Sequence, residues 1–206
     1  MQNRKIFGIG LNKTGTSTFA NCCSILGLKV APFDYSLLFD VAHNRYDRIF
    51  DIVDRYGVFE DWPYPLIYPL LDERYPNSKF VLTTRKSPEK WLASQKKHSL
   101  YVKPMRLENR IVYGHYYPDG HEKTYIDRYL EFNQHVRNYF KGRPDDLLEI
   151  CWEENDGWDS LCSFLGYKAR DEDIPHVNHG HDYRADFKRK MTNRLFALLF
   201  RNQNDL

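Results

Sequence analysis

The sequence predicts an α/β fold, a single-domain parallel β-sheet flanked by helices. Short apolar runs typical of buried strands alternate along the chain with segments of helical periodicity, and this alternation builds parallel sheets. The first of these strands turns through glycines directly into a helix. With 206 residues, of which 42% are hydrophobic and 28% charged, the chain suits one globular domain with a sizeable core.

The first strand–loop–helix unit, residues 5–19, is predicted to bind an anion. It begins apolar, turns through Gly8, Gly10 and Gly15, and ends in hydroxyl residues at a helix start. Loop amides and the positive end of the helix dipole form an anion cradle, and Lys13 adds a full charge. A glycine turn that merely closes the unit is the alternative. It does not explain a lysine together with four hydroxyl residues in the next five positions.

The later strands are apolar or β-branched runs bounded by turn residues. They are predicted over residues 28–31, 58–61, 79–84 and 147–151. The run 79–84 has the most continuous apolar pattern, which indicates a strand buried on both faces, and it ends at Arg85.

Helices are predicted where apolar residues recur every three to four positions. They cover residues 16–26, 35–56, 65–75, 88–97, 122–140, 158–165 and 183–201. Four of these segments are followed by a glycine at the position where helices end: Gly27, Gly57, Gly142 and Gly166. Ser87 and Pro88 supply an N-cap and a first-turn proline for the helix at 88–97.

Two segments lack a simple structural explanation. Residues 98–121 combine mixed charges, two prolines and several tyrosines without a clear period, which is typical of a lid or an acceptor-binding segment. The terminal segment 183–201 is a basic amphipathic helix, which we expect to pack on its own domain with its charges in solvent. A helix lying on a membrane surface is the alternative.

Composition restricts the class of protein. A net charge of +2 provides no global field for nucleic acid or acidic membranes, so no nucleic-acid partner is expected. The four cysteines lack zinc-site spacing and are predicted to be reduced, buried thiols: Cys22, Cys23, Cys151 and Cys162. The N-terminus leads directly into the first strand, and no run of about 18 apolar residues occurs. We therefore expect a cytoplasmic protein without a membrane span.

The anion loop differs from that of nucleotide hydrolases. Their loop reads G-x-x-x-x-G-K-[ST], with the lysine directly after the last glycine, whereas here Lys13 precedes Gly15. Such enzymes also need a carboxylate at a neighbouring strand end to hold Mg²⁺, and the strand 79–84 is followed by Arg85 instead. The sequence therefore predicts a P-loop-like site that works without a metal.

The chain resembles the sulfotransferase family, and its small bacterial-type branch in particular. The family's 5′-phosphosulfate loop reads Lys-Ser-Gly-Thr-Thr or close variants, which residues 13–17 match. A second family signature, a strand ending in arginine followed by a helix with a serine, is matched by Arg85 and Ser94. The spacing of nine is one longer than usual, and Ser87 is the alternative to Ser94. A third region, residues 139–178, extends the resemblance over most of the chain.

The resemblance implies a donor, 3′-phosphoadenosine 5′-phosphosulfate (PAPS), and a product, adenosine 3′,5′-bisphosphate. It assigns the bridging oxygen of the leaving phosphate to Lys13 and the 3′-phosphate to Arg85 and Ser94. It assigns the 5′-phosphate to the loop residues Thr14, Gly15, Thr16, Ser17 and Thr18. The acceptor is then a hydroxyl or amine of a small molecule or glycan. The late Arg-Lys-Gly loop of cytosolic members is absent from this sequence.

The base that activates the acceptor falls, by the same resemblance, on Asp61. A carboxylate needs a raised pKa to act near neutrality. A cap for the following turn is an equally open interpretation of Asp61, and Glu60 and Asp34 are weaker candidates for the base.

Two further interpretations stay open at the level of sequence. His176, His179 and His181 stand close enough to ligate a metal, although we favour a loop near the nucleotide. The rival functions are a Mg²⁺-dependent P-loop kinase of small substrates and a catalytically inactive nucleotide-binding protein. Oligomeric state is not predicted.

Overall fold

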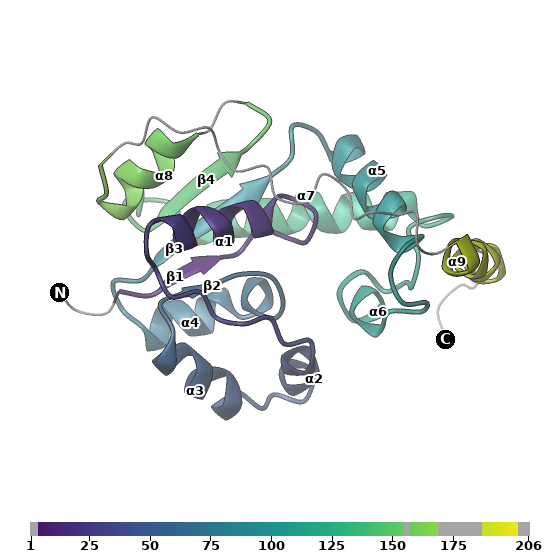
Figure 1. Cartoon of the computed structure of the whole chain (residues 1–206), viewed down its shortest axis with the longest axis horizontal. Helices are drawn as coiled ribbons and strands as arrows, with labels where there is room; N and C mark the ends of the chain where they lie inside the picture. The colour runs from purple at the N-terminus through teal and green to yellow at the C-terminus, as the bar shows by residue number, and fades with distance from the viewer. Residues whose placement is uncertain (1–3, 155–156, 169–186, 202–206) are drawn as a thin grey trace. The chain divides into compact units, whose positions relative to one another are not determined.

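The structure is a computed structural model that describes residues 4–154, 157–168 and 187–201 (Figure 1). The chain divides into two compact units, and each is described by itself. The first comprises Met1–Lys86 and His135–Val177, and the second comprises Ser87–Gln134 and Asn178–Leu206. The histidine cluster at 176–181 lies outside the described residues.

The first unit is built on a four-stranded, all-parallel sheet in the order β2-β1-β3-β4. Its strands are β1 (Ile6–Gly8), β2 (Val58–Phe59), β3 (Lys79–Thr84) and β4 (Leu147–Cys151). Phe7 of β1 pairs with Phe59 on one side and Phe80 on the other. The α/β class with a parallel sheet flanked by helices is thus confirmed.

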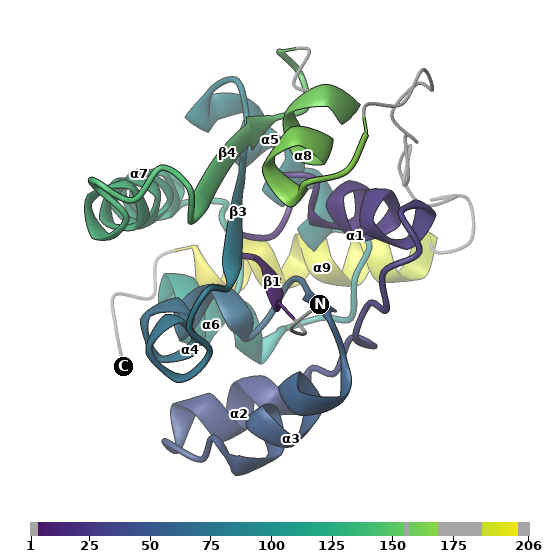
Figure 2. The same cartoon turned by 90° about the vertical axis from the view of Figure 1, so that its left-hand side faces the viewer.

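Each face of this sheet is covered by helices of the same unit. The helices and the single 3₁₀ turn are α1 (Thr16–Ile25), α2 (Ser36–Ala42), α3 (Asp47–Arg55), η1 (Tyr64–Leu66), α4 (Tyr68–Arg74) and α8 (Trp158–Leu165). Figure 2 shows α1 and α8 on one side of the strands and α4 on the other. The α1–α8 face is aliphatic, with Ile6, Val81 and Ile150 in one buried cluster.

The opposite face is aromatic because alternate strand residues point to it. Phe7 stacks between Phe59 and Phe80, at centroid distances of 5.0 and 5.4 Å. Phe80 continues the contact to Phe140 at 4.9 Å. The high aromatic content of the sequence therefore serves, in this unit, to fill the core beneath the strands.

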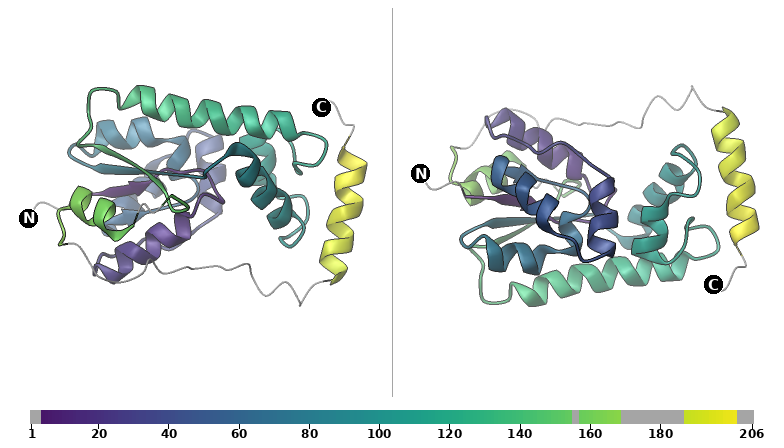
Figure 3. Two further views of the ribbon diagram at one scale, coloured as in Figure 1. Left: turned by 90° about the horizontal axis from the view of Figure 1, so that it is seen from above. Right: turned by 90° about the horizontal axis from the view of Figure 1, so that it is seen from below.

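The second unit contains α5 (Pro88–Ser99), α6 (Leu107–Tyr113), most of α7 (Glu122–Tyr139) and α9 (Phe187–Phe200) (Figure 3). Its core is a stack of rings: Trp91 lies 4.6 Å from Tyr129, and Tyr113 lies 4.5 Å from Tyr125. Ser87 caps α5 by accepting the Lys90 amide at 3.3 Å, as predicted.

Four sequence expectations need correction. No strand forms over 28–31, where only Val30 bridges to Val58. The helical segment 35–56 is two helices, because Asn44 adopts a left-handed backbone with φ 55° between them, a conformation that asparagine tolerates. The helix expected over 65–75 begins only at Tyr68, after the 3₁₀ turn. Residues 98–121, expected to lack regular structure, include helix α6.

Candidate active site

The anion loop connects β1 to α1 and is closed against β3. The Ile9 amide donates to the Val81 carbonyl at 2.8 Å. Thr14 is buried, and its Oγ1 lies 2.6 Å from both the Leu11 carbonyl and Thr83 Oγ1. The Thr14 hydroxyl therefore holds the loop in shape, and the loop amides and the neighbouring side chains remain to bind an anion.

Two glycines make this loop geometry feasible. A Cβ on Gly10 would lie 2.1 Å from Thr83 Oγ1 and 2.5 Å from the Thr83 carbonyl oxygen. Gly15 has φ 97°, and a Cβ there would lie 2.4 Å from Trp152 Cδ1. Gly10 permits close approach to β3, and Gly15 permits the left-handed turn that begins α1.

The N-terminus of α1 is suited to an external anion. Gly15 is its N-cap and provides no capping side chain, and no acidic residue lies in its first turn. Among the hydroxyl residues, Thr16 is buried, whereas Ser17 is exposed and Thr18 half-buried. Lys13 stands beside this helix end with φ 70°. Unsatisfied amides and a nearby cation are the features that hold phosphate at helix N-termini.

Arg85 lies at the carboxyl end of β3, beside the loop. Its guanidinium binds both carboxylate oxygens of Glu153, with Nε–Oε2 at 3.1 Å and Nη2–Oε1 at 2.9 Å. Its Nη1 donates to the Lys13 carbonyl at 3.4 Å. Arg85 and the anion loop therefore belong to one edge of the sheet. Glu153 was not singled out from the sequence, because a partner 68 positions away leaves no local pattern.

Ser94 and Ser87 are both in the second unit. Ser94 is a half-buried residue of α5, and Ser87 is committed to the N-cap of that helix. A role for Ser94 in binding the 3′-phosphate stays a prediction.

Glu60 and Asp61 follow β2 at the same edge of the sheet. Burial and, to a smaller extent, the charge of Asp61 raise the pKa of Glu60 to about 7, although a hydrogen bond from Thr16 lowers it. Burial raises the pKa of Asp61 to about 6, although the hydrogen bond from the Trp62 amide and the charge of Lys13 both lower it. Both carboxyls therefore interact with the region of the anion loop: Glu60 with Thr16, and Asp61 with Lys13.

The two interpretations of Asp61 are compatible. Asp61 Oδ1 accepts the Trp62 amide at 2.8 Å, which is the capping contact. The same carboxyl has a raised pKa and interacts with Lys13, as a base beside the donor loop would. Glu60 Oε2 is buried and, among the described residues, has no hydrogen-bond partner.

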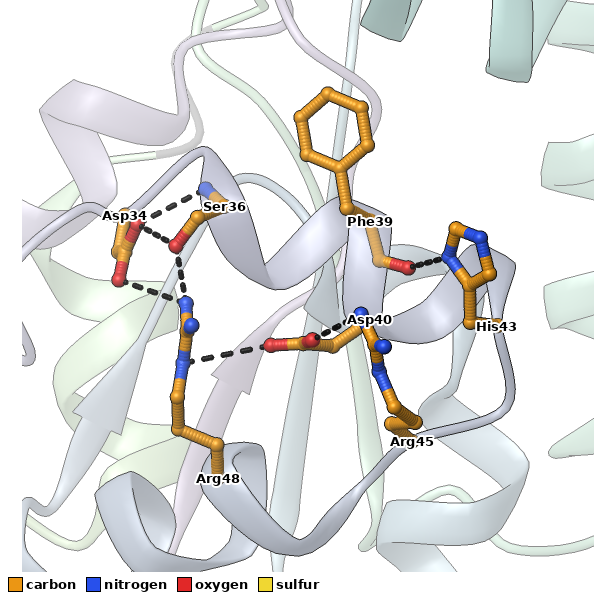
Figure 4. Close-up of polar contacts among 7 residues, drawn as sticks. All are labelled: Asp34, Ser36, Phe39, Asp40, His43, Arg45 and Arg48. Carbon is orange, nitrogen blue, oxygen red and sulfur yellow. Dashed lines mark hydrogen bonds and ion pairs between the residues drawn. The ribbon is translucent and has the colours of Figure 1, made fainter.

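Asp34, the remaining base candidate, is held in an ion-pair network (Figure 4). It accepts the Ser36 amide at 2.9 Å and hydroxyl at 2.6 Å, and Arg48 Nη2 at 3.1 Å. The hydrogen bond from the Ser36 hydroxyl is the main cause that lowers the pKa of Asp34. A carboxylate stabilised in this way is a weaker base than Glu60 or Asp61.

Trp152 was also missed by the sequence reasoning. It directly follows β4 and packs on Gly15, and its Nε1 is a buried donor without a partner among the described residues. The signal available in the sequence was an aromatic residue at the end of a strand, at the edge where parallel sheets bind ligands.

The tyrosines of segment 98–121 contribute to packing in the second unit. Tyr113 and Tyr117 are buried, and Tyr117 donates to Asn193 Oδ1 at 2.9 Å. Tyr125 donates to the His115 carbonyl at 2.8 Å. A role of this segment as a lid or in acceptor binding remains a prediction.

Metal ligands and membrane spans were sought over the same described ranges. There, no group of three or more histidine, cysteine or acidic residues is arranged to hold a metal ion. Within those ranges, too, no helix is both long and apolar enough to cross a membrane. The four cysteines are buried thiols, as predicted.

Comparison with known proteins identifies one family. Residues 5–111 and 98–183 match the family model described as sulfotransferase domain. A search of curated proteins gave no match. The matched range contains the anion loop, both carboxyls after β2, Arg85 and Trp152.

Proposed function

The chain belongs to the sulfotransferase domain family, and from this premise we propose that it transfers a sulfuryl group from PAPS to an acceptor hydroxyl or amine. The acceptor is a small molecule or a glycan, and the site of action is the cytoplasm. One observation carries the proposal: a helix N-terminus without a capping side chain, Lys13 and Arg85 lie at one edge of the sheet, next to two protonatable carboxyls.

The residues present suit a nucleotide with a phosphate group at each end. Because Gly10 and Gly15 have no side chain, the loop backbone is open to the 5′-phosphosulfate. Lys13 would stabilise the charge that develops on the leaving phosphate. Arg85 is a planar donor suited to the 3′-phosphate, and the phosphate would take the place that the Glu153 carboxylate occupies. Trp152 Nε1, which has no partner in the described part of the chain, is a further donor at this edge.

Asp61 is proposed as the base that removes the acceptor proton, with Glu60 as its rival. A base must be deprotonated to act, and its efficiency is greatest when its pKa lies near the working pH. Raised pKa values of about 6 for Asp61 and about 7 for Glu60 satisfy this condition. Asp61 is preferred because its charge interacts with Lys13, which places it nearer the donor loop's cation.

Calorimetric titration tests the proposal. Adenosine 3′,5′-bisphosphate should bind saturably in the presence of a chelator, because the loop and two cations replace a metal. Lys13→Ala should abolish transfer and weaken this binding, whereas Lys141→Ala, an exposed site away from the loop, should leave both unchanged. ATP binding that requires Mg²⁺ would favour the kinase instead. Nucleotide binding without turnover on any acceptor would favour the inactive binding protein.

A further inference from the structure

Helix α9 attaches to its unit through its small and polar residues. Asn193 is fully buried and Ala197 nearly so. Asn193 Nδ2 donates to the Leu100 and Val102 carbonyls, both at 3.0 Å, and its Oδ1 accepts from Tyr117. The helix is thereby held in one orientation by hydrogen bonds, and Phe200 adds a ring contact with Tyr116 at 5.5 Å. The helix thus packs on its own unit, as expected, but through a face other than the one that carries most of its large apolar residues.

Five large apolar side chains of α9 face solvent. The exposed fractions are 75% for Phe187, 48% for Met191, 57% for Leu195, 65% for Leu198 and 59% for Leu199. At 100° per residue these five fall within about 120° of the helix circumference, roughly opposite Asn193 and Ala197. We call them the α9 apolar stripe. A stripe this continuous is unlike the single exposed apolar residues of ordinary surfaces.

The charged residues of α9 itself are all positive. Residues 187–201 contain five cations and no aspartate or glutamate: Lys188, Arg189, Lys190, Arg194 and Arg201. On the same 100° projection, three of them (Lys190, Arg194 and Arg201) follow one border of the stripe, and Lys188 lies within it. Long cationic side chains at such borders reach the headgroup level while apolar neighbours enter the acyl boundary.

From this arrangement we propose that α9 is a membrane-surface helix that docks the protein on an anionic phospholipid bilayer. The positive charge of α9 favours an anionic bilayer over a second copy of the chain as the partner of the stripe. Two copies joined stripe to stripe would bring ten α9 cations together with no carboxylate on either helix, whereas an anionic leaflet attracts each cation and accepts the apolar side chains. Asn193 and Tyr117 fix the helix with its stripe outward, so no rearrangement of the unit is needed. This inference is independent of the proposed transferase activity.

Vesicle co-sedimentation of the full chain tests the proposal. Vesicles of phosphatidylcholine with about 30% phosphatidylserine should bind the protein at least about tenfold more than vesicles of phosphatidylcholine alone. Raising salt from about 0.1 to about 0.5 M should weaken this binding, because it screens the cations.

Matched variants distinguish binding through the α9 apolar stripe from nonspecific adsorption to the vesicles. Leu195→Gln/Leu198→Gln and Lys188→Gln/Arg194→Gln should each reduce binding about tenfold. Both pairs are exposed, so circular dichroism and thermal unfolding should match the wild type. Leu130→Gln, at an apolar position on α7 with 47% exposure, and Lys141→Gln/Lys168→Gln should bind as the wild type does.

Three results would overturn the proposal. One is the absence of sedimentation with the phosphatidylserine vesicles, and another is unchanged binding of the stripe variants. The third is a concentration-dependent dimer in analytical ultracentrifugation that Leu195→Gln/Leu198→Gln dissociates, because the stripe would then be an interface between copies.

Discussion

Two residues of the candidate site share an unusual backbone. Lys13 has φ 70° and Asp61 has φ 63°, both in the left-handed region. For a residue other than glycine this conformation costs on the order of 1 kcal/mol. Such strain persists where surrounding contacts fix the chain, and it concentrates at ligand sites. Here the Trp62 amide fixes Asp61, and packing of the loop on β3 fixes Lys13.

Substitution at the two carboxyls should identify the base. Asp61→Asn keeps the capping oxygen for Trp62 and tolerates the positive φ, so the fold should survive. If Asp61 removes the acceptor proton, turnover should fall by about 10²–10⁴-fold with donor affinity nearly unchanged. In the wild type the rate should rise as pH increases through about 6, because the pKa of Asp61 is raised to about 6 and a base acts only when deprotonated.

Glu60→Gln is the matched control for this experiment. It retains an oxygen for Thr16 and should reduce turnover only a few-fold. The opposite result, with Glu60→Gln inactive and the rate rising through about pH 7, would assign the base to Glu60, whose pKa is raised to about 7.

At the scale of elements, the β1–α1 loop depends on contact with β3. A Cβ on Gly10 would collide with Thr83 Oγ1 at 2.1 Å and with the Thr83 carbonyl at 2.5 Å. The carbonyl belongs to the backbone of a buried strand and cannot rotate away. Gly10→Ala should therefore lower the free energy of unfolding by about 3 kcal/mol, as measured by urea denaturation.

Gly57→Ala provides the comparison for Gly10→Ala. Gly57 directly precedes β2, and the nearest atom to an added Cβ is the Lys29 carbonyl at 3.8 Å. Its stability should change by less than about 1 kcal/mol. Equal effects of the two substitutions on the free energy of unfolding would show that the loop can move away from β3 without loss of stability.

Elements with local signals could be predicted from the sequence. The continuous apolar run gives β3, and Ser87 with Pro88 gives the start of α5. The glycines between residues 8 and 15 predict the turn from β1 into α1, because strand, turn and helix start are neighbours in sequence. The false strand at 28–31 shows the limit of the same reasoning: its apolar residues have only the short β2 beside them, and one bridge forms.

Features made by distant residues could not be predicted. The bond of Arg85 to Glu153 and the packing of Trp152 on Gly15 arise only when β4 takes its place beside β3. The commitment of the Thr14 hydroxyl to Thr83 is of the same kind, with 69 positions between the partners. The outward stripe of α9 also depends on a tertiary contact, since periodicity gives the apolar side of a helix but not whether that side is covered.

At the scale of the whole molecule, the raised carboxyl pKa values connect the site to stability. Glu60 rises from 4.5 to about 7 and Asp61 from 3.8 to about 6, so the folded protein holds protons that the unfolded chain releases. The stabilisation from these protons is complete below about pH 4 and is lost as pH rises through about 6 to 7.

The double variant Glu60→Gln/Asp61→Asn lacks both titrations, and its stability relative to the wild type should therefore depend on pH. At pH 8 the wild type carries two partly buried charges, so the variant should gain on the order of 2 kcal/mol relative to its value at pH 5. Urea denaturation of both proteins at the two pH values measures this difference. Other ionisable groups are common to both proteins and cancel in the comparison. A difference that stays constant with pH would mean that the two carboxyls titrate in the folded state as they do in the unfolded chain. The desolvation that fits them for proton removal would then be absent.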